Sequence, residues 1–137
     1  MAQSDWVACL NLGKVYVQQK KYQEAIAEFQ KARELSDGNT ETIAVMGHAF
    51  AVSGKRGEAK KVLDELTTIS NQRCVPPYNM AIIYTGLEEK EQALAWLEKA
   101  YEDRDVRLVF LKVEPKWDVL RADERFISLI RRVGLEQ

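Results

Sequence analysis

A pattern of apolar and small residues recurs along the chain at a constant offset of 34 residues. The recurring sets are Cys9, Leu12, Gly13 and Tyr16, then Ile43, Met46, Gly47 and Phe50, and finally Pro77, Met80, Ala81 and Tyr84. The spacing i, i+3, i+4, i+7 within each set places its four side chains on one face of an α-helix, where they can be buried together. A repeat of this length indicates that each copy forms one supersecondary unit, which buries its apolar face against its neighbours.

A second family of apolar residues follows the same offset and has the spacing i, i+4, i+7. Its members are Ala25, Phe29 and Ala32, then Ala59, Leu63 and Leu66, then Ala93, Leu97 and Ala100. Short polar or glycine-containing segments at 20–21, 53–55 and 86–88 separate the two helices of each copy. Connections this short favour antiparallel neighbours, so each copy is predicted to be a helical hairpin. Small residues such as Gly13 and Ala25 are expected where the two helices cross closely.

These residues resemble the tetratricopeptide repeat family, whose pattern is W-x2-L-G-x2-Y, then A-x3-F, then P over 34 residues. The first copy matches best, although Cys9 stands where the family prefers Trp, and turn-forming residues replace the closing Pro in all three copies. The resemblance implies an all-α fold, a right-handed α-solenoid of three hairpins with a C-terminal capping segment. The predicted divisions of this single domain, 1–137, are repeats at 6–39, 40–73 and 74–107 and a cap at 108–137.

The capping segment is less regular than the repeats. It begins like another first helix, but Pro115 is expected to stop that helix, whereas Asp123 can cap a last helix that ends at Gly134. A solenoid exposes apolar surface at its end unless a modified unit covers it, so the segment is expected to pack on the third repeat. The predicted packing residues are Trp117, Leu120 and Phe126.

The run from Tyr84 through KWDVLRADERF also resembles the end of tetratricopeptide arrays in bacterial signalling proteins, including winged-helix regulators and Ser/Thr kinases. This second resemblance implies that the chain is the sensor or docking part of something longer. A regulatory module of a larger signalling protein is therefore one alternative for its function.

In the tetratricopeptide family the first helices line a concave groove that binds partner peptides. The residues that correspond to groove positions and are singled out here are Leu10, Lys14, Val17, Ala44, His48, Tyr78, Asn79 and Ile82. An apolar groove with scattered hydrogen-bonding groups suits a partner helix or an extended segment. Tyr78 is the expected hot spot, because buried Tyr side chains contribute disproportionately to binding.

Charge and motifs argue against other classes of function. The 20 basic and 21 acidic side chains give a net charge of −1, and the paired Lys and Arg residues have acidic neighbours. Nucleic-acid binding is therefore the lesser alternative, and no membrane partner is expected. His48 is the only histidine, and neither Cys9 nor Cys74 has metal-ligand spacing. No enzyme activity, cofactor or metal is expected.

The sequence thus predicts a scaffold for protein–protein interaction whose partner is a protein or peptide, with self-association as a homodimer as the alternative. No apolar run approaches the roughly 18 residues of a membrane span, and the first residues lack the features of a signal peptide. A cytoplasmic location is therefore expected.

Overall fold

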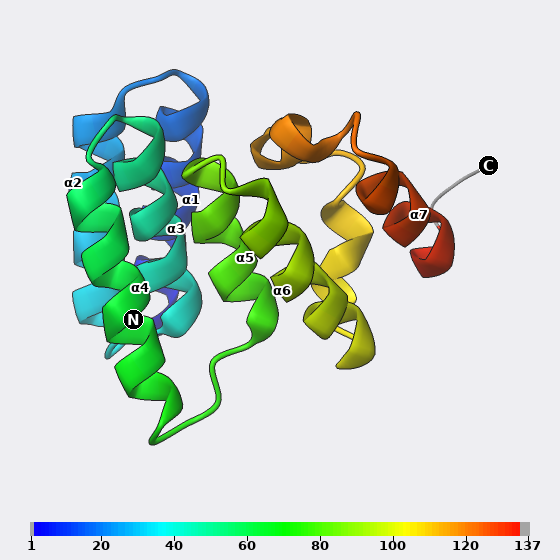
Figure 1. The fold of residues 1–137 in the computed structure, drawn as a ribbon. Helices are drawn as coiled ribbons and strands as arrows, with labels where there is room; N and C mark the ends of the chain where they lie inside the picture. Colours follow the sequence, from blue (N-terminus) through cyan, green and yellow to red (C-terminus); the bar gives the residue numbers. More distant parts are fainter. Residues whose placement is uncertain (1, 135–137) are drawn as a thin grey trace. The chain divides into compact units, whose positions relative to one another are not determined.

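A computed structural model describes residues 2–134, and in this range it contains helices and no strand. The α-helices are α1 (Ala2–Gln18), α2 (Tyr22–Leu35), α3 (Thr40–Val52), α4 (Arg56–Ser70), α5 (Pro77–Gly86), α6 (Lys90–Glu102) and α7 (Glu124–Val133), and the 3-10 helices are η1 (Val106–Phe110) and η2 (Pro115–Leu120). Successive helices pair as antiparallel hairpins (Figure 1). The predicted all-α fold of helical hairpins is confirmed.

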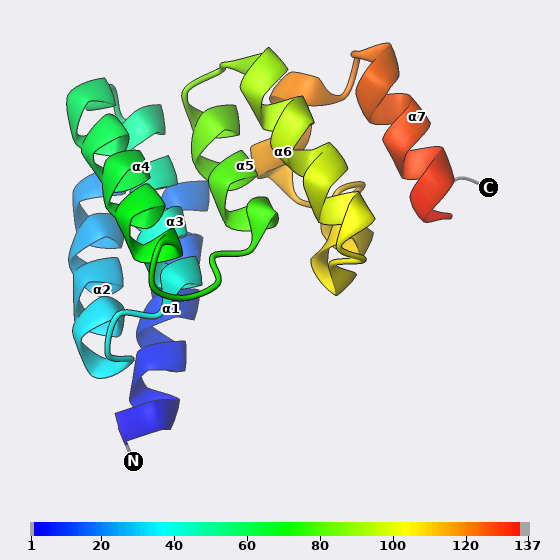
Figure 2. The same cartoon turned by 60° about the horizontal axis from the view of Figure 1, so that its bottom comes forward.

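The chain divides into two compact units, which meet in sequence between Val75 and Pro76. In unit 1, α1 packs on α2, α3 packs on α4, and α3 also packs on α2 (Figure 2). In unit 2, α5 packs on α6, η2 packs on α5, and α7 packs on α6. The grouping into a single domain stays a prediction, and residues 1 and 135–137 of its predicted span lie outside the described residues.

The turns within the hairpins repeat the 34-residue offset at the level of the backbone. Lys20, Gly54 and Glu88 adopt the left-handed conformation, with φ of 61°, 90° and 59°. In each turn the next residue donates its N–H five residues back, as in Lys21 to the Tyr16 carbonyl at 2.8 Å. This bond satisfies a carbonyl at the helix end, so the turn stops the first helix at the same place in every copy. Sequence reasoning placed the third turn at 86–88, whereas Gly86 is still helical and Glu88 adopts the left-handed conformation.

An apolar cluster in unit 1 explains how the second hairpin packs on the first. The cluster consists of Leu10 on α1, Ala25, Phe29 and Ala32 on α2, and Val45, Met46 and Ala49 on α3. The close crossing predicted at Gly13 is present, because a Cβ added there would lie 2.4 Å from Cε1 of Phe29. Full burial of a side chain such as Phe29 contributes roughly 1.5–3 kcal/mol.

The first helices differ in how completely their repeated apolar face is buried. Met46 and Met80 are buried, as the pattern predicted, but Leu12 at the equivalent position of α1 is 42% exposed. The physical reason is the neighbour: α3 packs on α2 of the preceding hairpin, whereas α1 opens the described part of the chain. Burial of this face thus depends on a helix that lies beside it, and the pattern alone does not supply one.

The capping segment behaves largely as predicted. Trp117, Leu120 and Phe126 are fully buried, and Oδ1 of Asp123 accepts a hydrogen bond from the backbone N–H of Arg125 at the start of α7. Gly134 ends α7 in the left-handed conformation. The expected fourth first helix, however, is replaced by η1 and η2, and Pro115 begins η2. A proline fits there because its missing N–H is not needed in a first turn.

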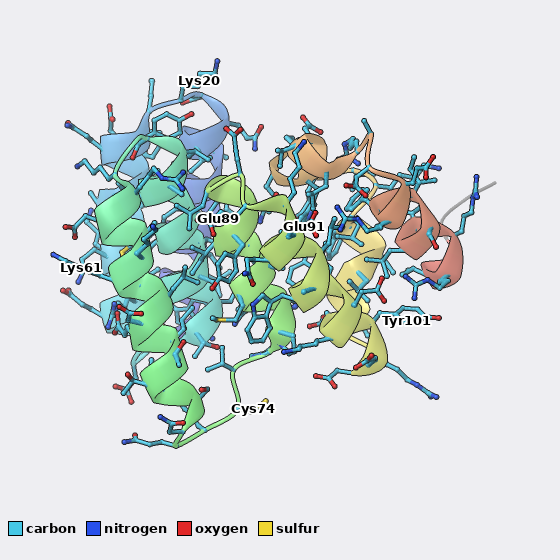
Figure 3. All side chains as sticks on the ribbon, viewed as in Figure 1. Lys20, Lys61, Cys74, Glu89, Glu91 and Tyr101 are labelled. Carbon is cyan, nitrogen blue, oxygen red and sulfur yellow. The ribbon has the colours of Figure 1, made fainter. Side chains whose placement is uncertain are left out.

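Ion pairs join α7 to α6 along the exposed side of unit 2. Arg125 donates to both carboxylate oxygens of Glu91, at 2.6 and 2.8 Å, and Arg132 pairs with Glu98. Arg132 also lies over the ring of Tyr101, which Figure 3 labels together with Glu91 on α6. Both ion pairs join residues 34 apart, which is the length of one repeat. Relative to α6, α7 therefore lies where the second helix of a following repeat would lie.

Candidate protein-binding surface

The predicted groove residues of unit 1 lie on α1 and α3. Leu10, Ala44 and His48 are buried, whereas Lys14 and Val17 are half-buried. Val7 and Val52, which lie on the same two helices, are exposed at 41% and 37%. This face therefore has a buried floor with apolar and charged side chains at its margin.

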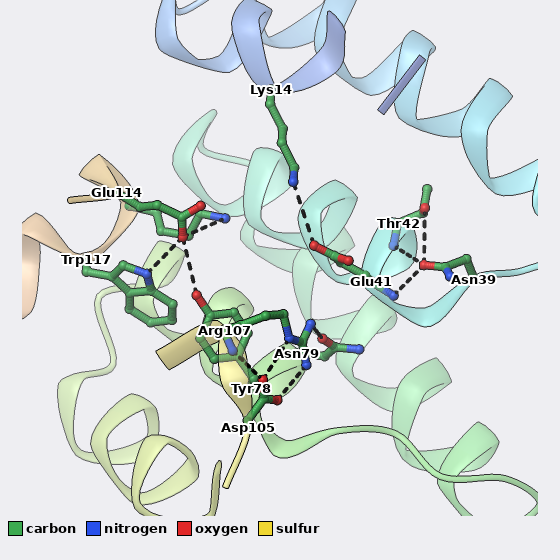
Figure 4. A network of polar contacts seen from close by, with 11 residues as sticks. Lys14, Asn39, Glu41, Thr42, Tyr78, Asn79, Asp105, Arg107, Glu114 and Trp117 are labelled. Carbon is green, nitrogen blue, oxygen red and sulfur yellow. Dashed lines mark hydrogen bonds and ion pairs between the residues drawn. The ribbon is translucent and has the colours of Figure 1, made fainter. Parts of the chain in front are cut away.

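Polar contacts fix the start of α3 and its approach to α1 (Figure 4). Oδ1 of Asn39 accepts hydrogen bonds from the backbone N–H groups of Glu41 and Thr42, at 3.0 and 3.1 Å. Such a cap satisfies donors that the first turn leaves unpaired, and so defines where α3 begins. Nζ of Lys14 then lies 3.7 Å from Oε2 of Glu41, which places one positive and one negative group together on this face.

An open pocket of about 460 Å³ lies at the end of the first hairpin. Its lining combines the apolar side chains of Trp6, Val7 and Leu35 with Ser36 and Asp37. Concave, mostly apolar sites of this size accept apolar side chains of a ligand. Sequence reasoning did not single out Trp6 or Leu35, because they fall outside the groove positions of the family.

The predicted groove residues of unit 2 lie on α5 and are all buried. Tyr78, Asn79 and Ile82 are 3%, 1% and 1% exposed. The ring of Trp117 meets that of Tyr78 edge-on, with centroids 5.4 Å apart, and the guanidinium of Arg107 lies 4.5 Å from the Tyr78 centroid. The face of α5 that the sequence predicts to bind a partner is therefore covered by the chain's own segment 105–117.

Arg107 is the centre of the polar contacts that hold this segment (Figure 4). Its guanidinium donates to Oδ1 of Asn79 at 2.8 Å and to both carboxylate oxygens of Asp105 at 3.1 and 2.8 Å. Partial burial works to raise the pKa of Asp105, but the hydrogen bonds from Arg107 outweigh burial and keep that pKa below its ordinary value. Asp105, which stands where the family has its closing Pro, thus also orients Arg107 toward α5.

Glu114 holds the other end of the covering segment. Its Oε1 accepts hydrogen bonds from the hydroxyl of Tyr78 at 3.3 Å and from Nε1 of Trp117 at 3.4 Å. Burial, followed by the nearby Glu114 carboxylate, raises the pKa of Tyr78 well above its ordinary value. The Tyr78 hydroxyl therefore remains protonated and serves as a hydrogen-bond donor.

The outer side of the covering segment presents exposed apolar residues that sequence reasoning missed. Val106 and Val113 are 81% and 70% exposed, and Val109 and Phe110 are exposed as well. A 3-10 helix repeats every three residues, so the buried Leu108 and Leu111 share one face and the exposed residues fall on the others. The run VRLVFLKV is apolar, but its apolar residues have no helical period, so the sequence does not indicate which of them are buried.

Within residues 2–134, no three His, Cys, Asp or Glu side chains are placed to hold a metal ion. Burial, with a smaller contribution from Glu28, raises the pKa of the Cys9 thiol, which disfavours the nucleophilic thiolate. None of the helices in the described range is both long and apolar enough to cross a membrane.

The fold and these surfaces are those of a helical-hairpin repeat protein. Residues 6–39 match a family model described as tetratricopeptide repeat, and residues 78–102 match a second model with the same description. The first match has the bounds predicted for repeat 1, and the second covers most of α5 and α6. These matches support the tetratricopeptide repeat family, whose repeats generally mediate protein–protein interaction and are typically non-enzymatic. No curated protein and no solved structure matches the chain significantly.

Proposed function

We propose that the chain is a protein-interaction module that binds a helix or extended segment of a partner protein on the face of α1 and α3 in unit 1. Of the predicted groove residues, the half-buried Lys14 and Val17 would contact the partner, and the buried Leu10, Ala44 and His48 would form the floor beneath them. The observation that carries the proposal is the covered face of α5, where the chain's own segment 105–117 is held by aromatic and charge-assisted contacts. A first helix of this fold thus offers a surface on which another polypeptide segment packs.

The side chains of this face define the chemistry of the partner. Val7, Val17 and Val52 offer apolar contact, and the pocket beside Val7 has room for one apolar anchor. The Lys14–Glu41 pair, half-exposed on both sides, provides a donor and an acceptor for polar groups that flank such an anchor. A preformed helical surface loses little conformational freedom on binding, so a partner segment needs only a few good anchors.

The groove residues of α5 have a different role in this proposal. Tyr78 and Asn79 hold segment 105–117 in place, and Ile82 is buried with them. They would contact a partner only in a state in which that segment has left α5. The binding site is therefore assigned to the unit 1 residues.

Ion pairing supports a protein partner over nucleic acid. Lys31 pairs with Glu28, Lys61 pairs with Glu58, each at 3.3 Å, and Arg33 pairs with Glu65. Neutralised basic side chains add little to the release of counterions that drives binding to phosphate backbones. The proposal accordingly assigns no nucleic-acid partner to the chain.

The proposal is tested by selecting peptides from a random display library on the wild-type chain. Val7→Asp combined with Val52→Asp places charges on the α1 and α3 face at exposed positions, so the fold should survive. We expect the double variant to bind the selected peptides at least about tenfold more weakly, which corresponds to roughly 1.4 kcal/mol. The matched control, Val106→Asp combined with Val113→Asp, adds the same two charges at exposed positions of unit 2 and should bind as the wild type does. If the wild type, the double variant and the control all bound the peptides equally and had unchanged melting curves, the proposed site would be wrong.

A further inference from the structure

The pocket at the end of the first hairpin combines apolar and aromatic walls with a carboxylate. Trp6 and Val7 contribute to it from α1, and Leu35, Ser36 and Asp37 contribute from the end of α2 and the turn that follows. Trp6 also packs against the apolar cluster of unit 1, which holds its ring in place. Asp37 is exposed, and none of the described residues that line the pocket is basic.

Both stretches of chain that form the pocket lack basic residues. No Lys or Arg occurs at 1–13 or at 34–54. The acidic residues of these stretches are Asp5, Glu34, Asp37 and Glu41. Only Glu41 is partly neutralised from α1, by Lys14 at 3.7 Å. The helix α2 also ends here, and the carbonyl groups at a helix C-terminus carry partial negative charge. The surroundings of the pocket therefore favour a cation over an anion.

Basic side chains of the chain itself show how a cation contacts groups of this kind. The guanidinium of Arg73 donates to the carbonyl of Gly38, next to Asp37, at 2.8 Å. Arg73 is not among the described residues that line the pocket, so it contacts the turn from outside it. In unit 2, Nζ of Lys99 lies 4.3 Å from the ring centroid of Trp96, because the face of an indole attracts positive charge.

We propose that this pocket binds an arginine or lysine side chain of the partner segment, an inference that rests on the proposed function. The aliphatic stem of that side chain is the apolar anchor and packs against Val7 and Leu35. Its charged end lies over the Trp6 ring and beside the Asp37 carboxylate. Long basic side chains bury their stems on apolar surface while their charge stays near water. An anchor without charge would cover Asp37 and leave its carboxylate without a positive partner, which is unfavourable.

Peptide selection from a random display library, carried out in parallel on the wild type and on Asp37→Asn, tests the inference. Residue 37 has a φ of 57°, a left-handed conformation that Asn adopts readily, so the variant should fold as the wild type does. Peptides selected on the wild type should share an Arg or Lys beside apolar residues, and those selected on Asp37→Asn should lose this preference. The matched control Asp103→Asn removes an exposed carboxylate at the end of α6 and should keep it. Wild-type peptides without a shared basic residue would overturn the inference.

A synthetic peptide from the wild-type selection then locates the contact. Replacing its basic residue with norleucine keeps an apolar stem and removes the charge, so binding to the wild type should weaken about 5- to 20-fold. Asp37→Asn should weaken binding of the original peptide about 2- to 5-fold. The norleucine peptide should bind Asp37→Asn and the wild type equally, because the pair is already broken. If Asp37→Asn weakened both peptides by the same factor, the basic residue would not lie at Asp37 and the inference would be wrong.

The same peptide separates this inference from the proposed function. Val52 lies at the end of α3, whereas the pocket lies beside the turn that precedes α3, so Val52→Asp changes the proposed face and not the pocket. If Val52→Asp weakened binding and Asp37→Asn did not, the pocket inference would be wrong and the proposed face would stand. If only Asp37→Asn weakened binding, the pocket would stand and the proposed face would be wrong. A wild type on which no peptide can be selected would overturn both.

Discussion

The two units begin in the same way and are completed differently. In unit 1 a second regular hairpin packs on the first through an apolar cluster of residues such as Phe29 and Met46. In unit 2 the single regular hairpin is followed by 3-10 segments, and the face of α5 is covered through polar and aromatic contacts centred on Tyr78. The hairpins of unit 1 thus pack through apolar residues that recur with the repeat, whereas the covering segment of unit 2 is held by a few specific side chains.

Removing the aromatic centre of unit 2 should cause the largest loss of stability. Trp117→Ala deletes a fully buried side chain that contacts Tyr78, so we expect the free energy of unfolding to fall by about 3–5 kcal/mol. Urea denaturation followed by circular dichroism measures the loss, and hydrogen exchange should place it in α5–α7. Phe110→Ala, at an exposed residue of the same segment, should change stability by no more than about 0.5 kcal/mol. Similar losses for the two variants would contradict a specific role for Trp117.

Overpacking at Gly13 should destabilise unit 1. Gly13→Leu forces a side chain into the ring of Phe29, because even a Cβ added at residue 13 would clash with that ring. We expect a loss of about 1–3 kcal/mol in the free energy of unfolding, visible as a lower melting temperature. If Phe29 causes the clash, the combination with Phe29→Ala should cost less than the sum of the two single changes. Strict additivity would show that the clash lies elsewhere.

A smaller effect should come from the polar contacts of unit 2. Tyr78→Phe removes the hydroxyl that donates to Glu114, and we expect a loss of about 0.5–1.5 kcal/mol in the free energy of unfolding at neutral pH. The measurement is urea denaturation at a series of pH values, with Tyr22→Phe in unit 1 as the matched control.

The pH dependence of the free energy of unfolding gives a second test of the Tyr78 hydroxyl. Because burial raises the pKa of Tyr78, folding favours its neutral form, and this contribution is present below the ordinary Tyr pKa of about 10. As the pH rises past that value the unfolded chain ionises first, so wild-type stability should fall. Tyr78→Phe should lack this part of the fall. An identical alkaline dependence of the two proteins would argue against the buried, protonated hydroxyl.

The smallest expected effect concerns the start of α7. Hydrogen bonds from the side chain and backbone of Arg125 lower the pKa of Asp123 to about 2, so its contribution to stability is present above the ordinary Asp pKa of about 3.8. That contribution should be lost as the pH falls from this value toward 2. Asp123→Ala should lower the melting temperature slightly at pH 6 and should remove part of the acid-induced decrease. Melting curves between pH 2 and 6 measure both, and an unchanged acid dependence would contradict the assigned cap.

The regular hairpins could be predicted from the sequence because their determinants are local. The positions of residues such as Gly13, Ala25 and Phe29 recur every 34 residues, so the pattern in each copy supports the helices predicted for the others. The buried residues of the cap could also be predicted, since Trp117 is a large apolar side chain in a segment that must cover a hairpin end.

The covering of α5 could not be predicted, because it depends on contacts without a period. Tyr78 has the features of a binding hot spot. Only the positions of Arg107 and Glu114, far along the chain, show that its side chain already packs against the chain's own covering segment. The exposure of Leu12 was missed for a related reason. Its apolar spacing matches that of Met46, but burial depends on the neighbouring helix and not on the residue.

The central claim is that partners bind the α1 and α3 face of unit 1, while the equivalent face of α5 is held by the chain itself. The most direct test is an NMR titration of the ¹⁵N-labelled chain with a display-selected peptide. The claim predicts that amide shifts concentrate in residues 7–18 of α1 and 41–52 of α3. Shifts confined to α2 and α4, or to the segment 105–120, would contradict it.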